Sequence, residues 1–347
     1  MRWGLDSQSH CSTTKDKREQ RLRVISREVL WQNSRQFGTL IGLFAVMVIF
    51  WILSPYFLSV SNLMNIAEQT SINAIIAVGM TFVIITAGID LSVGSIVALS
   101  GIVLADLLQG GHSEPVAIVA GLTVGTVCGL VNGSLISYGK LPPFIATLGM
   151  MSVARGTALF YSDGRPISGF DAGFRFIATG EVLSIPVPVI LMGLLYVVAY
   201  VVLNRTKLGR YAYAIGGNEE AANLSGINTK LIKTVVYGMC GLLSGLAAVV
   251  LTARLNSAQP IAGIMYELDA IAAVVIGGTS LIGGEGKISG TLIGAFIMGI
   301  LRNGLNLLGI SSFTQQIIIG SVIILAVLID MALRKDRKPL FGKGLFK

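Results

Sequence analysis

Apolar residues run in long stretches along most of the chain, and polar residues gather at its two ends. About ten of these stretches approach the ~20 residues that a helix needs to cross a bilayer. Their length predicts an all-α integral membrane protein with about ten transmembrane helices. The spans are expected at about 37–54, 65–86, 92–109, 116–138, 144–162, 186–203, 233–253, 267–284, 289–308 and 314–333.

Lys and Arg residues are distributed unevenly enough to predict the orientation of these spans. Ten spans place both termini on one side, and cytoplasmic loops carry an excess of Lys and Arg. With both termini in the cytoplasm, 21 of the 26 Lys and Arg residues lie on the cytoplasmic side and three lie outside. We expect a cytoplasmic tail at 1–36, a transmembrane domain at 37–333, an external loop at 163–185, a cytoplasmic loop at 204–231 and a basic cytoplasmic tail at 334–347.

The composition agrees with a chain that lies mostly in a lipid bilayer. Hydrophobic residues make up 53% of the sequence, the mean hydropathy is +0.75 and only 13% of the residues are charged, against about 25% in soluble domains. The net charge of +8 is spread as a topology signal and forms no basic patch. Nucleic acid is therefore not expected as a partner.

Motifs for metal binding and catalysis are missing from the sequence. The three cysteines show no CxxC spacing and the two histidines lie far apart, so neither a zinc site nor a disulfide framework is expected. A P-loop needs GxxxxGK[ST], but the Gly-Lys pairs here are followed by Leu141, Ile288 and Gly344. We expect no catalytic residue, no metal and no cofactor in this chain.

Glycines recur every four residues through one expected span, at Gly121, Gly125, Gly129 and Gly133. On a helix they form one smooth face, against which a neighbouring helix packs closely. The ridge fits either static packing, which is the more general use of such ridges, or helices that rock during transport.

An internal repeat is suggested by an ungapped shift of 196 residues, which aligns Ala74–Gly94 with Ala270–Gly290 and makes six of 21 positions identical. Transporters often contain such repeats. Two membrane segments rich in Gly and Ala also match by chance, and both explanations stay open.

The cytoplasmic loop contains a clear local helix signal. Asn218 is a good N-cap, Glu219 and Glu220 fall where the helix dipole favours anions, and Gly226 supplies a C-terminal stop. The pattern predicts a short helix at 219–225.

A helix this short is not stable alone, because isolated helices need about 12–15 residues. It must lean on a partner protein below the membrane, on its own bundle or on the lipid surface. The acidic pair argues against the lipid surface, since the inner leaflet is negative.

Four segments carry a specific resemblance: Thr206–Ile227, Val78–Gly101, Asp269–Ala295 and Arg302–Ile310. In this order they resemble the permease subunits of ribose/xylose/galactose-type ABC sugar importers. The resemblance covers roughly residues 40–335, and the long N-terminal tail departs from it.

The resemblance implies an ABC importer permease fold in a bacterial cytoplasmic (inner) membrane, working as a homodimer. It also implies an ATP-binding cassette ATPase that uses ATP and Mg²⁺, and an extracytoplasmic sugar-binding protein. The helix in the loop would be the coupling helix that sits in a cleft of the ATPase. Its residues would be Asn218, Glu219, Glu220, Ala221, Ala222, Asn223, Leu224, Ser225 and Gly226.

Polar residues inside spans are candidates for the pathway of a neutral, hydroxyl-rich sugar, because such groups are costly in lipid. The candidates are Asn73, Asp90, Asn132, Arg302, Asn303 and Asn306. Asn303 and Asn306 share a helix face. For Asp90, in a tight turn between two spans, a structural capping role is favoured over substrate contact. Glu68, Glu267 and Asp269 are expected near outer ends of spans.

The alternative function is an ion-gradient-driven secondary transporter, which needs an intramembrane carboxylate or a broken-helix ion site. No pair of carboxylates is expected in the middle of a span. A membrane-embedded enzyme, the third possibility, lacks a nucleophile–base set or a metal motif.

Overall fold

The structure of the chain is a computed structural model that describes residues 38–335, with side chains described to Leu328. The predicted tail at 1–36 lies outside the described residues, as does nearly all of the predicted tail at 334–347.

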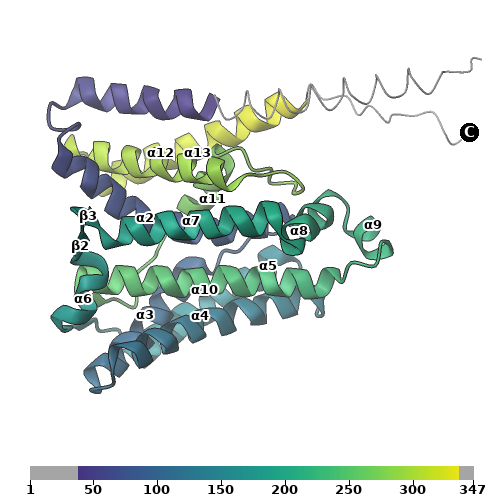
Figure 1. The fold of residues 1–347 in the computed structure, drawn as a ribbon, viewed down its shortest axis with the longest axis horizontal. Coiled ribbons are helices and arrows are strands. Elements are labelled where there is room, and N and C mark those ends of the chain that lie inside the picture. The colour runs from purple at the N-terminus through teal and green to yellow at the C-terminus, as the bar shows by residue number, and fades with distance from the viewer. Residues whose placement is uncertain (1–37, 336–347) are drawn as a thin grey trace, which may run out of the picture.

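Helices make up most of the described chain and run roughly along one direction (Figure 1). The described part of the first helix is Gly38–Leu53. The others are α2 (Val60–Ile85), α3 (Val93–Gln109), α4 (Glu114–Ser137), α5 (Pro143–Tyr161), α6 (Ala172–Thr179), α7 (Val187–Arg205), α8 (Lys207–Gly217), α9 (Glu219–Leu224), α10 (Thr229–Leu255), α11 (Tyr266–Ile276), α12 (Ile288–Leu307) and α13 (Ser312–Lys335).

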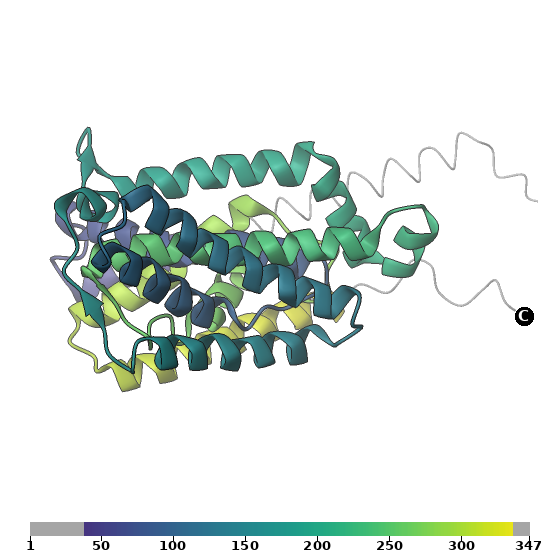
Figure 2. The same ribbon diagram turned by 90° about the horizontal axis from the view of Figure 1, so that it is seen from below.

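Four two-residue strands form two antiparallel pairs. They are β1 (Ile167–Ser168) with β4 (Ser257–Ala258), and β2 (Glu181–Val182) with β3 (Ile185–Pro186). Helix α6 and the β2–β3 pair lie at one end of the bundle, called here the α6 end. Helices α8 and α9 lie at the opposite end, the α9 end, and Figure 2 shows them projecting there.

A helix stands in each of the ten apolar segments predicted from the sequence. Within the described residues, six helices are long and apolar enough to cross a membrane, namely α2, α4, α5, α7, α10 and α12. The chain is therefore a multi-pass α-helical membrane protein. The count of ten spans and the cytoplasmic position of the termini stay predictions.

The prediction of one continuous span at 267–284 is wrong in its extent. Helix α11 ends at Ile276 and a glycine-rich loop follows to Lys287. Gly278, Gly283 and Gly284 have positive φ, a backbone conformation that glycine adopts without steric cost and that does not continue a helix. The loop is short and has no charged residue before Glu285, so the sequence does not mark where α11 ends.

Helix α2 lies at the centre of the bundle, in contact with α7, α10, α11 and α12. From Thr70 to Thr86 every residue is buried except Asn73, which is half-buried. A helix that is apolar and buried on all sides must be covered by protein throughout. Its surroundings therefore fix its position.

The two segments related by the shift of 196 residues have the same organisation. In the first, α2 stops at Ile85 and α3 begins at Val93; in the second, α11 stops at Ile276 and α12 begins at Ile288. Each unit is a helix, an irregular break and a second helix. Asn73 and Asp269, which differ by the same 196 positions, touch each other at 3.4 Å between Nδ2 and Oδ2.

The glycine ridge of α4 packs against α10. A Cβ atom added at Gly125 would collide with the carbonyl oxygen of Gly241, and one at Gly129 with the carbonyl oxygen of Tyr237. At Gly133 the added atom would stand 2.6 Å from the Cα of Thr234. The two backbones are so close that only hydrogen fits between them, as in small-xxx-small contacts.

We expect Gly125→Ala to force α4 and α10 apart and to lower the free energy of unfolding by about 1–3 kcal/mol, the usual cost of overpacking. Thermal unfolding of the purified protein in detergent measures the effect. Gly193→Ala on α7 is the matched control, because nothing lies within 4 Å of a Cβ atom there. Equal melting temperatures for the two variants would contradict the close contact.

Candidate functional site

Helix α9 has the local structure that its sequence predicts. The Asn218 side chain accepts a hydrogen bond from the N–H of Ala221 at 2.9 Å, and Glu219 and Glu220 stand in the first turn. The helix spans Glu219–Leu224, one residue less than expected, and Ser225 is its C-cap. Gly226 follows with φ +83° and turns the chain toward α10.

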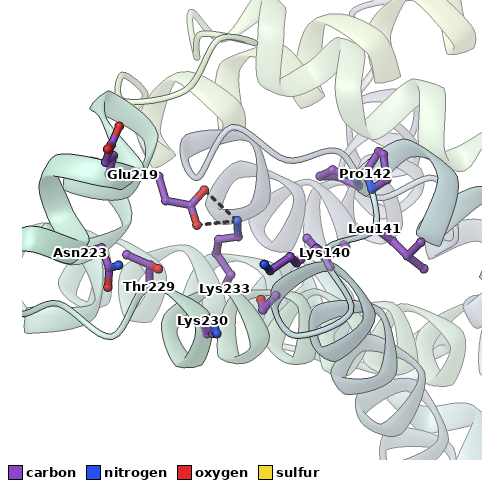
Figure 3. Close-up of a pocket in the computed structure, with 12 residues that line it drawn as sticks. Lys140, Leu141, Pro142, Glu219, Asn223, Thr229, Lys230 and Lys233 are labelled. Carbon is purple, nitrogen blue, oxygen red and sulfur yellow. Dashed lines mark hydrogen bonds and ion pairs between the residues drawn. The ribbon is translucent and has the colours of Figure 1, made fainter.

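An ion pair attaches α9 to its own bundle. Lys233 on α10 donates to both carboxylate oxygens of Glu219, at 2.8 and 2.9 Å (Figure 3). Ala222 is the buried residue of this helix. The opposite face is open, and the Leu224 side chain is 84% exposed. The helix therefore leans on its own bundle with one face and presents the other face to solvent.

A groove of about 570 Å³ separates α9 from the loop between α4 and α5. Figure 3 shows Lys140 and Pro142 on one side of the groove and Glu219 and Asn223 on the other. An adjoining cavity of about 400 Å³ shares Glu219 and Lys233 in its lining and reaches Gly88 in the α2–α3 break. The space beside α9 thus leads to the first break.

Close contacts connect α8 to the break between α2 and α3 and to the loop between α11 and α12. The N–H of Gly284 donates to the carbonyl oxygen of Ile85 at 2.9 Å, and a Cβ atom at Gly216 would collide with that same oxygen. The Tyr213 hydroxyl on α8 donates to the carbonyl oxygen of Gly286 at 2.7 Å. The C-terminal end of α8 is therefore wedged between the end of α2 and the α11–α12 loop. We call this contact the glycine joint.

Sequence reasoning missed the glycine joint. Gly216 and Gly217 directly precede the N-cap Asn218, and this glycine pair was the available signal. Its partners Ile85 and Gly284 are distant in the sequence, and no motif pairs them with the loop.

Asp90 organises the first break. Its Oδ1 accepts hydrogen bonds from the backbone N–H and the hydroxyl of Ser92, at 2.9 and 2.5 Å. Asn132 on α4 donates to the same hydroxyl at 2.8 Å. Asp90, Ser92 and Asn132 are fully buried, and this network ties the start of α3 to α4. Asp90 therefore holds the turn before α3 in place, but it does not cap the helix, because the N-cap of α3 is Ser92 and has no side-chain cap hydrogen bond.

Asn303 and Asn306, expected to face a pathway together with Arg302, have separate structural partners. Asn303 and Asn62 on α2 exchange two side-chain hydrogen bonds, at 3.1 and 3.0 Å. Asn306 accepts a hydrogen bond from Gln315 on α13 at 2.7 Å. These amides join α12 to its two neighbours, so the expected convergence with Arg302 is not observed.

Asp269 stands in the first turn of α11, near a helix end as expected, but it is buried. Its side chain is 4% exposed and lies 2.5 Å from the Arg302 guanidinium, measured between Oδ2 and Nη2. Asn73 donates to the same oxygen. Of the six pathway candidates, the structure brings Asn73 and Arg302 together around Asp269, and places Asp90 with Asn132 elsewhere.

A family profile described as "Branched-chain amino acid transport system / permease component" matches residues 62–327. The chain belongs to this permease family. The matched range includes α2 to α12 and most of α13, and therefore contains both breaks, the glycine joint and α9.

Relatives within the family carry the names of sugar permeases. The ribose import permease protein of Bacillus subtilis is 53% identical over 298 residues, which cover 85% of this chain and 92% of the relative. The ribose import permease protein of Escherichia coli K12 is 52% identical over 296 residues, 84% and 92% of the two chains. The D-allose transport system permease protein of the same organism is 42% identical over 302 residues, 86% and 93%. No solved structure matches the chain.

We expect Asn303→Leu to destabilise the protein by about 1–3 kcal/mol, because it leaves the buried Asn62 side-chain oxygen without its donor. The change of the other amide, Asn62→Leu, should also destabilise the protein, because it removes the same pair of hydrogen bonds. The double variant is expected to lose about 1 kcal/mol less than the sum of the two single changes. Thermal unfolding of the four proteins gives the coupling, and strict additivity would contradict the amide pair.

Proposed function

We propose that this chain is the permease subunit of an ATP-driven importer that carries ribose or a related monosaccharide across a bacterial cytoplasmic membrane. The observation that carries the proposal is the 53% identity to a ribose import permease protein over 92% of that relative. In this proposal two copies of the chain form the pathway. A separate cassette ATPase supplies the energy from ATP and Mg²⁺, and an external binding protein delivers the sugar.

Charge supports an orientation with the α9 end in the cytoplasm. That end exposes several basic side chains from the loops and helices around α8, and cytoplasmic loops are enriched in such residues. They are Lys140, Arg205, Lys207, Arg210 and Lys230. The predicted tails at 1–36 and 334–347 then lie on the same side.

The open face of α9 supports docking of the ATPase there. An exposed leucine beside two acidic residues, on a helix held by one ion pair to its own bundle, gives an apolar anchor with a polar rim. Such an arrangement is common at protein interfaces. A movement of α9 would pass through α8 and the glycine joint to the breaks next to α2 and α11. In this proposal the segment Asn218–Gly226 is the coupling helix.

The energy source distinguishes this proposal from an ion-driven carrier, for which the buried carboxylates Asp90 and Asp269 would be the coupling groups. We expect ribose uptake by cells that depend on this chain to stop when ATP is depleted. Uptake should persist when the proton gradient is collapsed at constant ATP. Uptake that survives ATP depletion but stops when the proton gradient is collapsed would contradict the proposal.

We expect Leu224→Asp to weaken association with the ATPase by at least about tenfold, as a lost apolar anchor does at an interface. Folding should be unaffected, because the side chain is already 84% exposed. Co-purification of the ATPase from membranes in mild detergent measures association. Leu183→Asp, at the α6 end and 91% exposed, is the matched control and should retain the ATPase.

A further inference from the structure

A cluster of polar side chains surrounds a small cavity inside the bundle. It is formed by Gln69, Thr70 and Asn73 of α2, Asp269 of α11 and Arg302 of α12, and the cavity measures about 20 Å³. We call these five residues the α2–α11–α12 cluster. The volume is room for one water molecule or one hydroxyl group.

The α2–α11–α12 cluster lies inside the bundle, with Asp269 in the first turn of α11 and Arg302 five residues before the end of α12 at Leu307. Arg302 follows the start of α12 at Ile288 by a helix length of roughly 21 Å, and Asn73 precedes the end of α2 at Ile85 by roughly 18 Å. The hydrocarbon core of a bilayer is ~30 Å thick. Charged and amide groups buried among membrane-spanning helices are costly and are candidates for function.

Two acceptor atoms at the cavity have no partner. The Thr70 hydroxyl and the Asn73 carbonyl oxygen are buried and make no hydrogen bond to any of the described residues, and Thr70 is only 2% exposed. A buried polar atom without a partner is rare and costs free energy. Such an atom beside an open volume indicates that a further polar group binds there.

The available chemistry fits a hydroxyl group. Asp269 and Asn73 offer acceptor oxygens, Arg302 offers N–H donors, and Thr70 and Gln69 do both. A sugar hydroxyl both donates and accepts, so it satisfies this mixture. Because the carboxylate of Asp269 is already paired with Arg302, the cluster is balanced in charge and suits a neutral ligand.

One side chain of the Arg302–Asp269 pair is accessible. The Arg302 side chain is 39% exposed, against 4% for Asp269. A neutral polyol that approaches beside Arg302 would therefore contact the guanidinium first. The unpaired oxygens of Thr70 and Asn73 lie in the same cavity. Gly299, one turn before Arg302, leaves this space free, since a Cβ atom there would collide with the Thr70 hydroxyl.

We infer that the α2–α11–α12 cluster binds a hydroxyl of the transported sugar inside the bundle, with Thr70 and Asn73 as the contact residues. The inference rests on the proposed function and names the site at which the permease itself holds its substrate. In the present conformation one hydroxyl fits, and the remainder of the sugar ring requires α2, α11 and α12 to separate.

The test compares transport with energy use in proteoliposomes that contain the full permease, its ATPase and binding protein, with ribose as the probe. Thr70→Val removes the hydroxyl at nearly constant shape, and we expect it to lower the ribose moved per ATP hydrolysed by about fivefold, the effect of one hydrogen bond. Thr70→Ser, which restores a hydroxyl, should return the ratio close to that of the wild type. Gly299→Ala, which fills the space, should lower it further.

Thr81→Val is the matched control. Thr81 is a buried hydroxyl on the same helix, paired with Thr291 at 2.8 Å and outside the cavity, so the ratio should not change. An unchanged ratio in Thr70→Val would mean that the cavity holds a structural water only, and would overturn the inference. A wild-type complex that hydrolyses ATP but moves no ribose would instead refute the proposed substrate.

Discussion

In hydrocarbon there is no water to satisfy a free N–H or C=O group, so every backbone group must find its partner inside the protein. Regular helices solve this problem along most of the chain. The breaks after α2 and α11 do not, and protein covers only part of each, since Ala87 and Ile282 are exposed. The N–H of Gly284 bonds to the carbonyl of Ile85, and the Tyr213 hydroxyl bonds to the carbonyl of Gly286. The same contacts that satisfy the breaks therefore connect them to α8.

Close approach of backbones makes these connections stiff. A Cβ atom added at Gly277 would collide with the carbonyl oxygen of Gly290, and one added at Gly290 with the carbonyl oxygen of Gly277. The same holds for Gly125 and Gly241. Packed interiors transmit displacement because they have no free volume to absorb it. Glycine thus has a mechanical consequence here: helices in contact through their backbones move together, with no side chain between them to change rotamer.

The sequence predicts the helices well because apolar length is a strong signal for membrane helices, and it predicts α9 because the cap residues Asn218 and Gly226 act locally. It fails where local signals mislead or are absent. The loop after Ile276 begins without a charged residue and contains Leu281 and Ile282, so the sequence does not mark the break. Asn303 pairs with Asn62, 241 positions away, so its role as a link between α2 and α12 is visible only in three dimensions. The Asp269–Arg302 pair was missed for the same reason.

Helix α2 contacts α11 or the loop that follows it at two places. These contacts connect the glycine joint with the α2–α11–α12 cluster. At the α9 end, Ile85 of α2 bonds to Gly284 of the loop that follows α11. At the start of α11, Asn73 of α2 donates to Asp269. A helix transmits displacement along its axis because its backbone hydrogen bonds hold its length. In the proposed mechanism, a shift of α8 at the glycine joint would change the spacing of α2 and α11, two of the three helices whose side chains line the cavity. In the proposed mechanism, opening that cavity and moving α9 would be one displacement.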